Sequence, residues 1–137
     1  MKKMNKIIIH HSGKSKGNSK NIKLHNNELD NIYNFIIDNG NLKEDGFIEK
    51  VRNIKINSAN NSIGICLIGN LNIDKPTKAQ LNSLIYLLKN LKKEFDINID
   101  DIIRHKDLES LEKNCPGKNF NINQIKKQIV DSLEELF

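Results

Sequence analysis

The sequence predicts an α/β fold: a single domain over residues 1–137, with a central mixed β-sheet flanked by helices. Short β-branched runs alternate along the chain with two longer stretches in which leucine or isoleucine recurs at helical spacing. The length of 137 residues fits one domain, and two prolines are too few for a Pro-rich linker. With 37% hydrophobic and 28% charged residues, the composition is that of a globular protein.

The predicted strands are short, apolar and rich in β-branched or aromatic residues. They are Ile7–His11, Ile32–Ile37, Gly46–Val51, Ile63–Ile68 and Ile99–Arg104. Three consecutive isoleucines in the first strand indicate burial on both faces. The turn sequence Asp38-Asn39-Gly40 predicts that the third strand pairs back on the second. Polar loops are expected over Ser12–Asn21 and Asn57–Asn61.

Two amphipathic helices are predicted. The first follows Pro76 and runs to about Phe95, because Thr77 and Gln80 form a capping box ahead of a leucine stripe. The second covers Asn121–Leu136. A short, weak helix is expected over Asn21–Leu29. Both apolar stripes are interpreted as core rather than as partner surfaces.

Charge and hydropathy exclude several classes of protein. The formal net charge is +5, but the lysines are scattered and form no arginine-rich block, so we expect a solvated surface and no specific nucleic-acid site. No segment approaches the length of a membrane span. The basic start, Met1 to Lys6, precedes only three isoleucines, too short for a signal peptide. We therefore expect cytoplasmic synthesis without an encoded export route. We also expect the protein to be a monomer.

Candidate metal ligands lie at the ends of predicted elements. His10 and His105 each end a strand, and Cys115 precedes Pro-Gly in a polar stretch, whereas Cys66 lies in a buried-strand pattern typical of a core residue. Two imidazoles and a thiolate suit zinc, which keeps a fourth position open for water in catalytic sites. Successive strand side chains face opposite ways, so only one of His10 and His11 can face a given pocket. From these residues alone, ordinary histidines and a metal site are equally supported.

Six stretches, in order along the chain, carry a resemblance. They are Ile7–Ser12, Tyr33–Ile37, Asn61–Asn70, Pro76-Thr77 with Gln80-Leu81, His105–Asp107 and Lys113–Lys118. In this order they resemble the zinc-dependent N-acetylmuramoyl-L-alanine amidases, the family shared by small phage lysozyme-type amidases and the peptidoglycan recognition proteins. The resemblance covers nearly the whole chain.

The resemblance implies one zinc ion per chain, held by His10, His105 and Cys115. It implies that Tyr33 is the active-site tyrosine, and it places Lys113 where phage-type members carry a catalytic lysine. An ammonium at that position would stabilise the oxyanion of a tetrahedral intermediate. Asp107 is expected either to orient a ligand histidine or to cap a turn.

The implied function is hydrolysis of the amide between N-acetylmuramic acid and L-alanine in peptidoglycan, by a phage or prophage endolysin that reaches the wall after release. The alternative is a non-catalytic peptidoglycan-binding or regulatory module. The chain departs from the family in two shortened segments, Ser12–Tyr33 and Gly46–Asn61, and in having no tryptophan.

Overall fold

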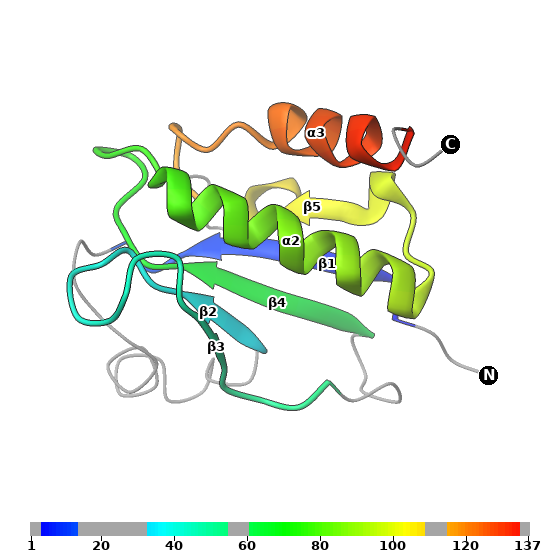
Figure 1. Cartoon of the computed structure of the whole chain (residues 1–137), viewed down its shortest axis with the longest axis horizontal. Helices are drawn as coiled ribbons and strands as arrows, with labels where there is room; N and C mark the ends of the chain where they lie inside the picture. Colours follow the sequence, from blue (N-terminus) through cyan, green and yellow to red (C-terminus); the bar gives the residue numbers. More distant parts are fainter. Residues whose placement is uncertain (1–3, 14–32, 55–60, 109–114, 135–137) are drawn as a thin grey trace.

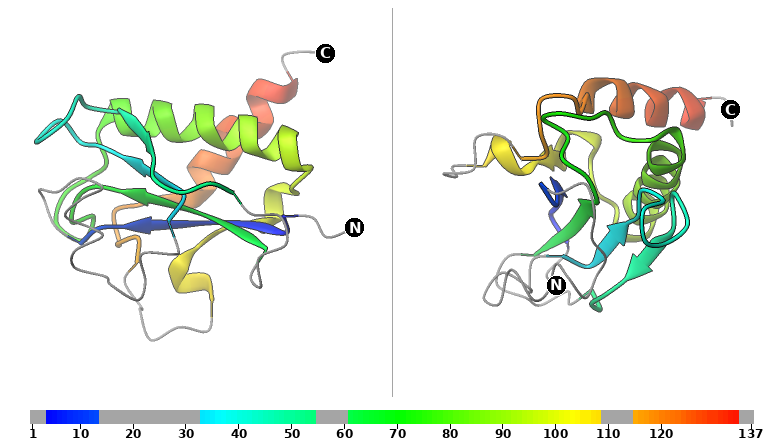
Figure 2. Two further views of the ribbon diagram at one scale, coloured as in Figure 1. Left: turned by 90° about the horizontal axis from the view of Figure 1, so that it is seen from below. Right: turned by 90° about the vertical axis from the view of Figure 1, so that its left-hand side faces the viewer.

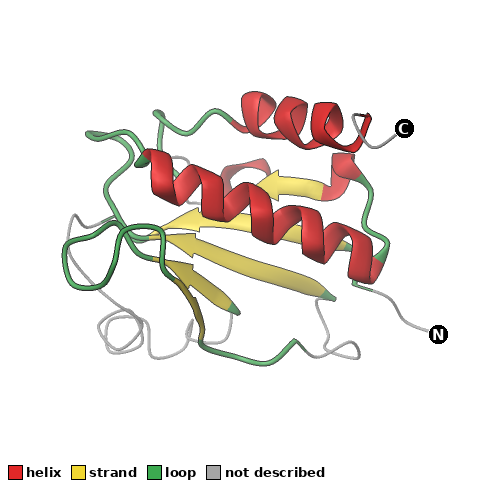
Figure 3. Ribbon diagram, in the orientation of Figure 1, coloured by secondary structure: helices red, strands yellow, loops and turns green. Residues whose placement is uncertain are grey.

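The computed structural model describes residues 4–13, 33–54, 61–108 and 115–134, and it confirms the α/β class (Figures 1 and 3). The elements, in chain order, are β1 (Lys6–His11), β2 (Phe35–Ile37), β3 (Ile48–Lys50), β4 (Ser62–Leu67), α2 (Lys78–Phe95), η2 (Ile99–Asp101), β5 (Ile102–Arg104), η3 (His105–Asp107) and α3 (Ile122–Glu134). The helix expected over Asn21–Leu29 and most of the two expected loops lie outside the described residues. Among the described residues, no helix is long and apolar enough to span a membrane.

The sheet is mixed, as predicted. Its strand order is β3-β2-β4-β1-β5, and every neighbouring pair is parallel except β2 and β3, which form the expected antiparallel pair. Strand β1 therefore lies between β4 and β5, and the carboxyl ends of four strands meet at one edge of the sheet. Ligand sites of open α/β sheets are commonly built at this edge.

Helices α2 and α3 cover the same face of the sheet (Figure 2). Leu84 and Leu88 of α2 and Ile129 of α3 are fully buried against alternate strand residues such as Ile7 and Ile9. Both apolar stripes are thus core, as predicted. The opposite face carries a second, smaller buried cluster of Tyr33, Ile36, Cys66 and Ile68.

The capping box at the start of α2 is confirmed, and its Gln80 side chain also makes hydrogen bonds to the sheet that the sequence did not indicate. Thr77 Oγ1 accepts the Gln80 N–H at 2.9 Å, and Gln80 Oε1 accepts the Thr77 N–H at 3.0 Å. The buried Gln80 amide also donates to the carbonyls of Ile37 and Ile68, at 3.2 and 2.8 Å. One side chain therefore joins the start of the helix to the ends of β2 and β4.

Three strands begin later in the chain than predicted. Ile99 to Asp101 form a turn of 3₁₀ helix, so the strand predicted from Ile99 begins at Ile102. The strand predicted from Gly46 begins at Ile48, because Gly46 has φ +83° and a Cβ there would lie 2.8 Å from the Ala79 carbonyl oxygen. The strand predicted from Ile32 begins at Phe35, after a bend at Asn34.

A buried carboxyl pair lies where β2 meets β3. Asp38 follows β2 directly, and Glu49 pairs with Ile36 across the two strands. Glu49 accepts a hydrogen bond from Lys43 Nζ, whereas neither carboxylate oxygen of Asp38 meets a donor among the described residues. Burial, followed by the hydrogen bond to Glu49 and the charge of Glu49, raises the pKa of Asp38 to about 7. The raised pKa favours a protonated Asp38, whose hydroxyl can donate to Glu49 and gives one of the buried oxygens a partner.

This pair predicts a pH-dependent stability. A carboxyl whose folded pKa lies above its ordinary value stabilises the fold fully at low pH, and this stabilisation is lost as pH rises from about 4 through about 7. The Asp38→Asn variant carries a donor that does not titrate. We expect its free energy of unfolding to exceed that of the wild type by an amount that grows across this window, reaching about 1–2 kcal/mol.

The measurement is urea unfolding at several pH values from 4 to 8. The exposed Asp74 provides the matched control, and Asp74→Asn should follow the wild type throughout. A constant difference between Asp38→Asn and the wild type across the window would show that Asp38 does not hold a proton in the fold.

Candidate metal centre

The first two candidate ligands are brought together by strand register. Strands β1 and β5 are parallel with Ile9 opposite Arg104, so the next residues along each strand, His10 and His105, are neighbours. Adjacent strands lie about 4.8 Å apart, and the centroids of the two imidazole rings lie 4.6 Å apart. His105 was expected to end its strand. It instead begins the short helix η3, directly after the strand.

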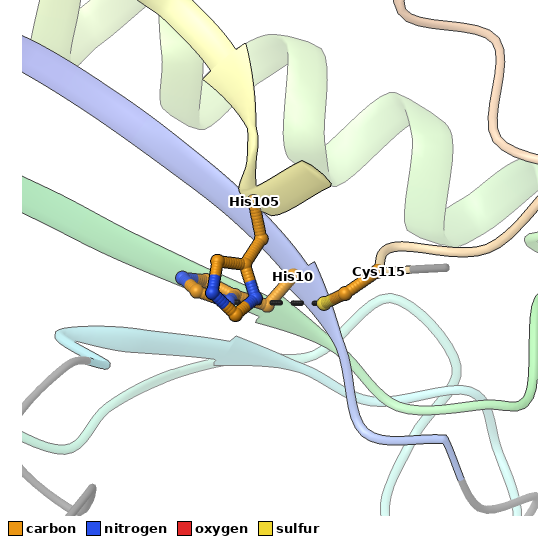
Figure 4. A group of neighbouring side chains, drawn as sticks. All are labelled: His10, His105 and Cys115. Carbon is orange, nitrogen blue, oxygen red and sulfur yellow. Dashed lines mark hydrogen bonds between the residues drawn. The ribbon is translucent and has the colours of Figure 1, made fainter. Parts of the chain in front are cut away.

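Cys115 completes the group (Figure 4). Its Sγ lies 3.8 Å from His10 Nδ1, and its carbonyl accepts the backbone N–H of Lys106 at 2.8 Å. The second contact ties the cysteine segment to the residue that follows His105. The possible ligand atoms of His10, His105 and Cys115 all lie within 4.8 Å of one another.

The alternation of side chains along β1 separates the two adjacent histidines. His10 is buried on the face that carries Cys66 and Tyr33. His11 accepts the backbone N–H of Leu71 through Nδ1 at 3.0 Å. The structure therefore brings His10, and not His11, into the group with His105 and Cys115.

This donor set fits a zinc ion. Zinc bonds of about 2.0–2.1 Å to nitrogen and about 2.3 Å to sulfur separate tetrahedral ligand atoms by roughly 3.3–3.6 Å. The His10–Cys115 separation of 3.8 Å is already close to this range. Burial, followed by the charges of His105 and His11, lowers the pKa of His10 to about 3, so its ring is neutral and able to bind a metal. Three ligands leave a position open for a reactant.

Tyr33 lies against His10, the first candidate ligand. Its ring meets His10 edge to face, with centroids 5.0 Å apart and an interplanar angle of 71°. Regular alternation would put Tyr33 on the same face as Phe35 and Ile37, which pack under the helices. Tyr33 instead belongs to the cluster with Ile36 and Cys66 on the opposite face. The bend at Asn34 accounts for this change of face.

Asn34 maintains the bend with its own side chain. Its Oδ1 accepts the Gly64 N–H at 3.0 Å, while its backbone N–H donates to the Gly64 carbonyl at 2.8 Å. The side-chain amide donates to the carbonyls of Arg52 and Asn53, at 3.4 and 3.2 Å. Sequence analysis missed this role, although a polar residue inside the apolar run Tyr33–Ile37 was a signal for it.

Cys66 and Asp107 are not members of the ligand group. Cys66 is a buried core residue as predicted, burial raises the pKa of its thiol, and it forms no disulfide with Cys115. Asp107 takes the turn role, since its carboxylate accepts from the backbone N–H of Arg104 at 3.0 Å and from its guanidinium at 3.0 and 2.7 Å. Lys113 lies outside the described residues.

Comparisons with known proteins identify one family. Residues 1–118 match the N-acetylmuramoyl-L-alanine amidase family. Two solved structures from Clostridium intestinale, the N-acetylmuramoyl-L-alanine amidase LysC and the endolysin amidase LysCS, are each 29% identical to the chain. They align over 91% of the chain and over 84% and 82% of their own lengths, with TM-scores of 0.76 and 0.75.

More distant structures share the fold. Bumblebee PGRP-SA is 22% identical over 90% of the chain and 80% of its own length, with a TM-score of 0.67. A point mutant of Drosophila PGRP-LB, in complex with tracheal cytotoxin, is 21% identical over 91% and 81%, also with a TM-score of 0.67. No curated protein sequence matches the chain.

Proposed function

Because the chain belongs to the N-acetylmuramoyl-L-alanine amidase family, we propose that this amidase is a zinc hydrolase acting on the bond between N-acetylmuramic acid and L-alanine in peptidoglycan. The observation that carries the zinc assignment is the convergence of two imidazoles and one thiol, from three separate segments, within 4.8 Å. Similarity to an endolysin amidase supports action on the bacterial wall. We propose one zinc per chain, a monomer, and action on the cell wall.

His10, His105 and Cys115 would hold the metal, with the thiol as thiolate and both rings neutral. Zinc bound there supplies Lewis acidity towards the amide carbonyl and lowers the pKa of a bound water towards about 7. Buried side chains exclude water from one side of the ligand group, since Ile36, Cys66 and Ile68 are fully buried beneath it.

Tyr33 and Lys113 are the proposed catalytic residues. The edge-to-face contact of Tyr33 with His10 supports a role for its hydroxyl in orienting water or donating to the substrate oxygen as negative charge develops. Lys113, two residues before the thiolate ligand in sequence, would place an ammonium against that oxygen. A thiolate ligand makes zinc a weaker Lewis acid than a third imidazole would, so a cationic residue has more to contribute here.

The complete ligand group favours catalysis over the alternative of a non-catalytic peptidoglycan-binding or regulatory module. Such a module needs no ligand group. In this chain two buried ligands and a partly buried third converge at the carboxyl edge of the sheet.

The proposed function predicts a bound metal. Purified protein should contain one zinc per chain and release free L-alanine amino termini from peptidoglycan in a chelator-sensitive reaction. Cys115→Ser should lose both zinc and activity, because a hydroxyl does not replace a thiolate ligand at neutral pH. Cys66→Ala, which removes the other thiol, is the matched control and should retain zinc. Full zinc content in Cys115→Ser would rule out the proposed ligand set.

The proposed function also predicts a role for Lys113. Lys113→Ala should keep its zinc and lose about 100-fold or more in kcat, the effect of removing one oxyanion donor in other hydrolases. Lys118→Ala removes the same charge from an exposed position five residues later in the sequence and should leave the rate unchanged. A fully active Lys113→Ala enzyme would mean that the lysine has no part in the reaction.

A further inference from the structure

The loop that follows β4, Gly69–Asp74, lies between the end of β1 and the segment that follows Cys115. On its β1 side, the backbone N–H of Leu71 donates to His11 Nδ1 at 3.0 Å. A backbone amide is only a donor, so Nδ1 of His11 must be the acceptor and is unprotonated. His11 thereby fixes the position of Leu71 relative to the strand that carries His10.

The other side of the same loop holds the cysteine segment. The Leu71 carbonyl accepts the Asn119 N–H at 2.9 Å, and Asn72 Oδ1 accepts the Lys118 N–H at 3.0 Å. Gly117 is pressed directly against Leu71: a Cβ at Gly117 would lie 2.5 Å from the Leu71 carbonyl carbon. With φ +104° as well, Gly117 allows an approach that no other residue would permit without displacement.

These contacts form a continuous chain from β1 to the third ligand. His11 holds Leu71, Leu71 holds the backbone at Gly117 and Asn119, and Cys115 lies two residues before Gly117. At the end of this chain the Cys115 Sγ lies 3.8 Å from His10 Nδ1. Metal–ligand distances tolerate errors of only about 0.2 Å. A shift of the 69–74 loop would therefore change the distance from the Cys115 sulfur to the metal enough to weaken binding.

We infer that His11 is a positioning residue of the metal centre, acting through Leu71 to set the distance between Cys115 and His10. The inference rests on the proposed zinc function. Two consecutive residues of β1 then contribute to one site from opposite faces of the sheet: His10 binds the metal, and His11 holds the loop that in turn contacts the segment with Cys115.

The test compares variants of His11 that differ in whether an acceptor remains. His11→Ala and the larger His11→Leu remove it, and His11→Asn keeps one, because its Oδ1 lies close to where Nδ1 was. We expect the first two to bind zinc about 10-fold or more weakly in competition with a chromophoric chelator. His11→Asn should bind within about threefold of the wild type. The thiolate-to-metal absorption of the Co²⁺-substituted protein should weaken and recover in the same order.

A purely structural anchor would lower the melting temperature of the metal-free protein without changing zinc affinity in the folded state. Ser83→Ala provides the comparison, since it removes one hydrogen bond, to the Gly46 carbonyl at 2.6 Å, on a different loop. Its zinc affinity should equal that of the wild type. Affinity is measured well below each melting temperature, and His11→Leu serves if His11→Ala does not fold.

The outcomes separate this inference from the proposed function. Wild-type protein that binds no zinc would overturn the proposed function itself. Wild-type protein that binds zinc, with His11→Ala and His11→Leu binding equally well, would overturn only the positioning role. Equally weak binding by His11→Asn and His11→Ala would also overturn it, because the acceptor at Nδ1 would then not be the cause.

Discussion

The parallel register between β1 and β5 is the constraint on which the candidate centre depends. Ile9 pairs with Arg104, so His10 and His105 follow as neighbours at the same edge of the sheet. A slip of one residue in β1 would turn His10 towards the helices and bring His11 to the other face. The register is strongly specified because Ile7 and Ile9 are fully buried beneath α2 and α3. The hydrophobic core thereby determines which histidine joins the centre.

The two faces of the sheet have different roles: one carries the main core and the other borders the candidate site. One face is covered by α2 and α3 and carries the larger core, and the other carries the smaller cluster beside His10. Two polar side chains connect the parts at the carboxyl edge. Gln80 joins α2 to the ends of β2 and β4, and His11 joins β1 to the loop after β4. The site is therefore held by the ends of several strands rather than by one segment.

Sequence patterns predicted those parts of the fold that depend on local periodicity. The capping box at Thr77, the leucine stripe of α2 and the buried strand around Cys66 need only neighbouring residues to be recognised. The bend at Asn34 could not be predicted in this way, because it depends on the backbone of Gly64 in another strand. The Asp38–Glu49 pair likewise exists only through the register of β2 and β3.

For the site, the pattern of strand ends identified His10 and His105 as candidates, and side-chain alternation required that only one of the adjacent histidines face the pocket. Alternation could not choose between them, since the choice depends on which face the helices cover. Strict alternation back from β2 would likewise have put Tyr33 on the wrong face, because the bend at Asn34 precedes β2. Contacts between distant segments, such as His11 with Leu71, leave no local signal.

X-ray absorption at the zinc edge of the loaded protein tests the central claim most directly. The proposed ligands predict one sulfur at about 2.3 Å, two imidazole nitrogens at about 2.0–2.1 Å and one further oxygen from solvent. That shell describes an open catalytic centre built by His10, His105 and Cys115. A shell without sulfur, or one filled by four protein ligands, would contradict both the ligand set and the hydrolytic role derived from it.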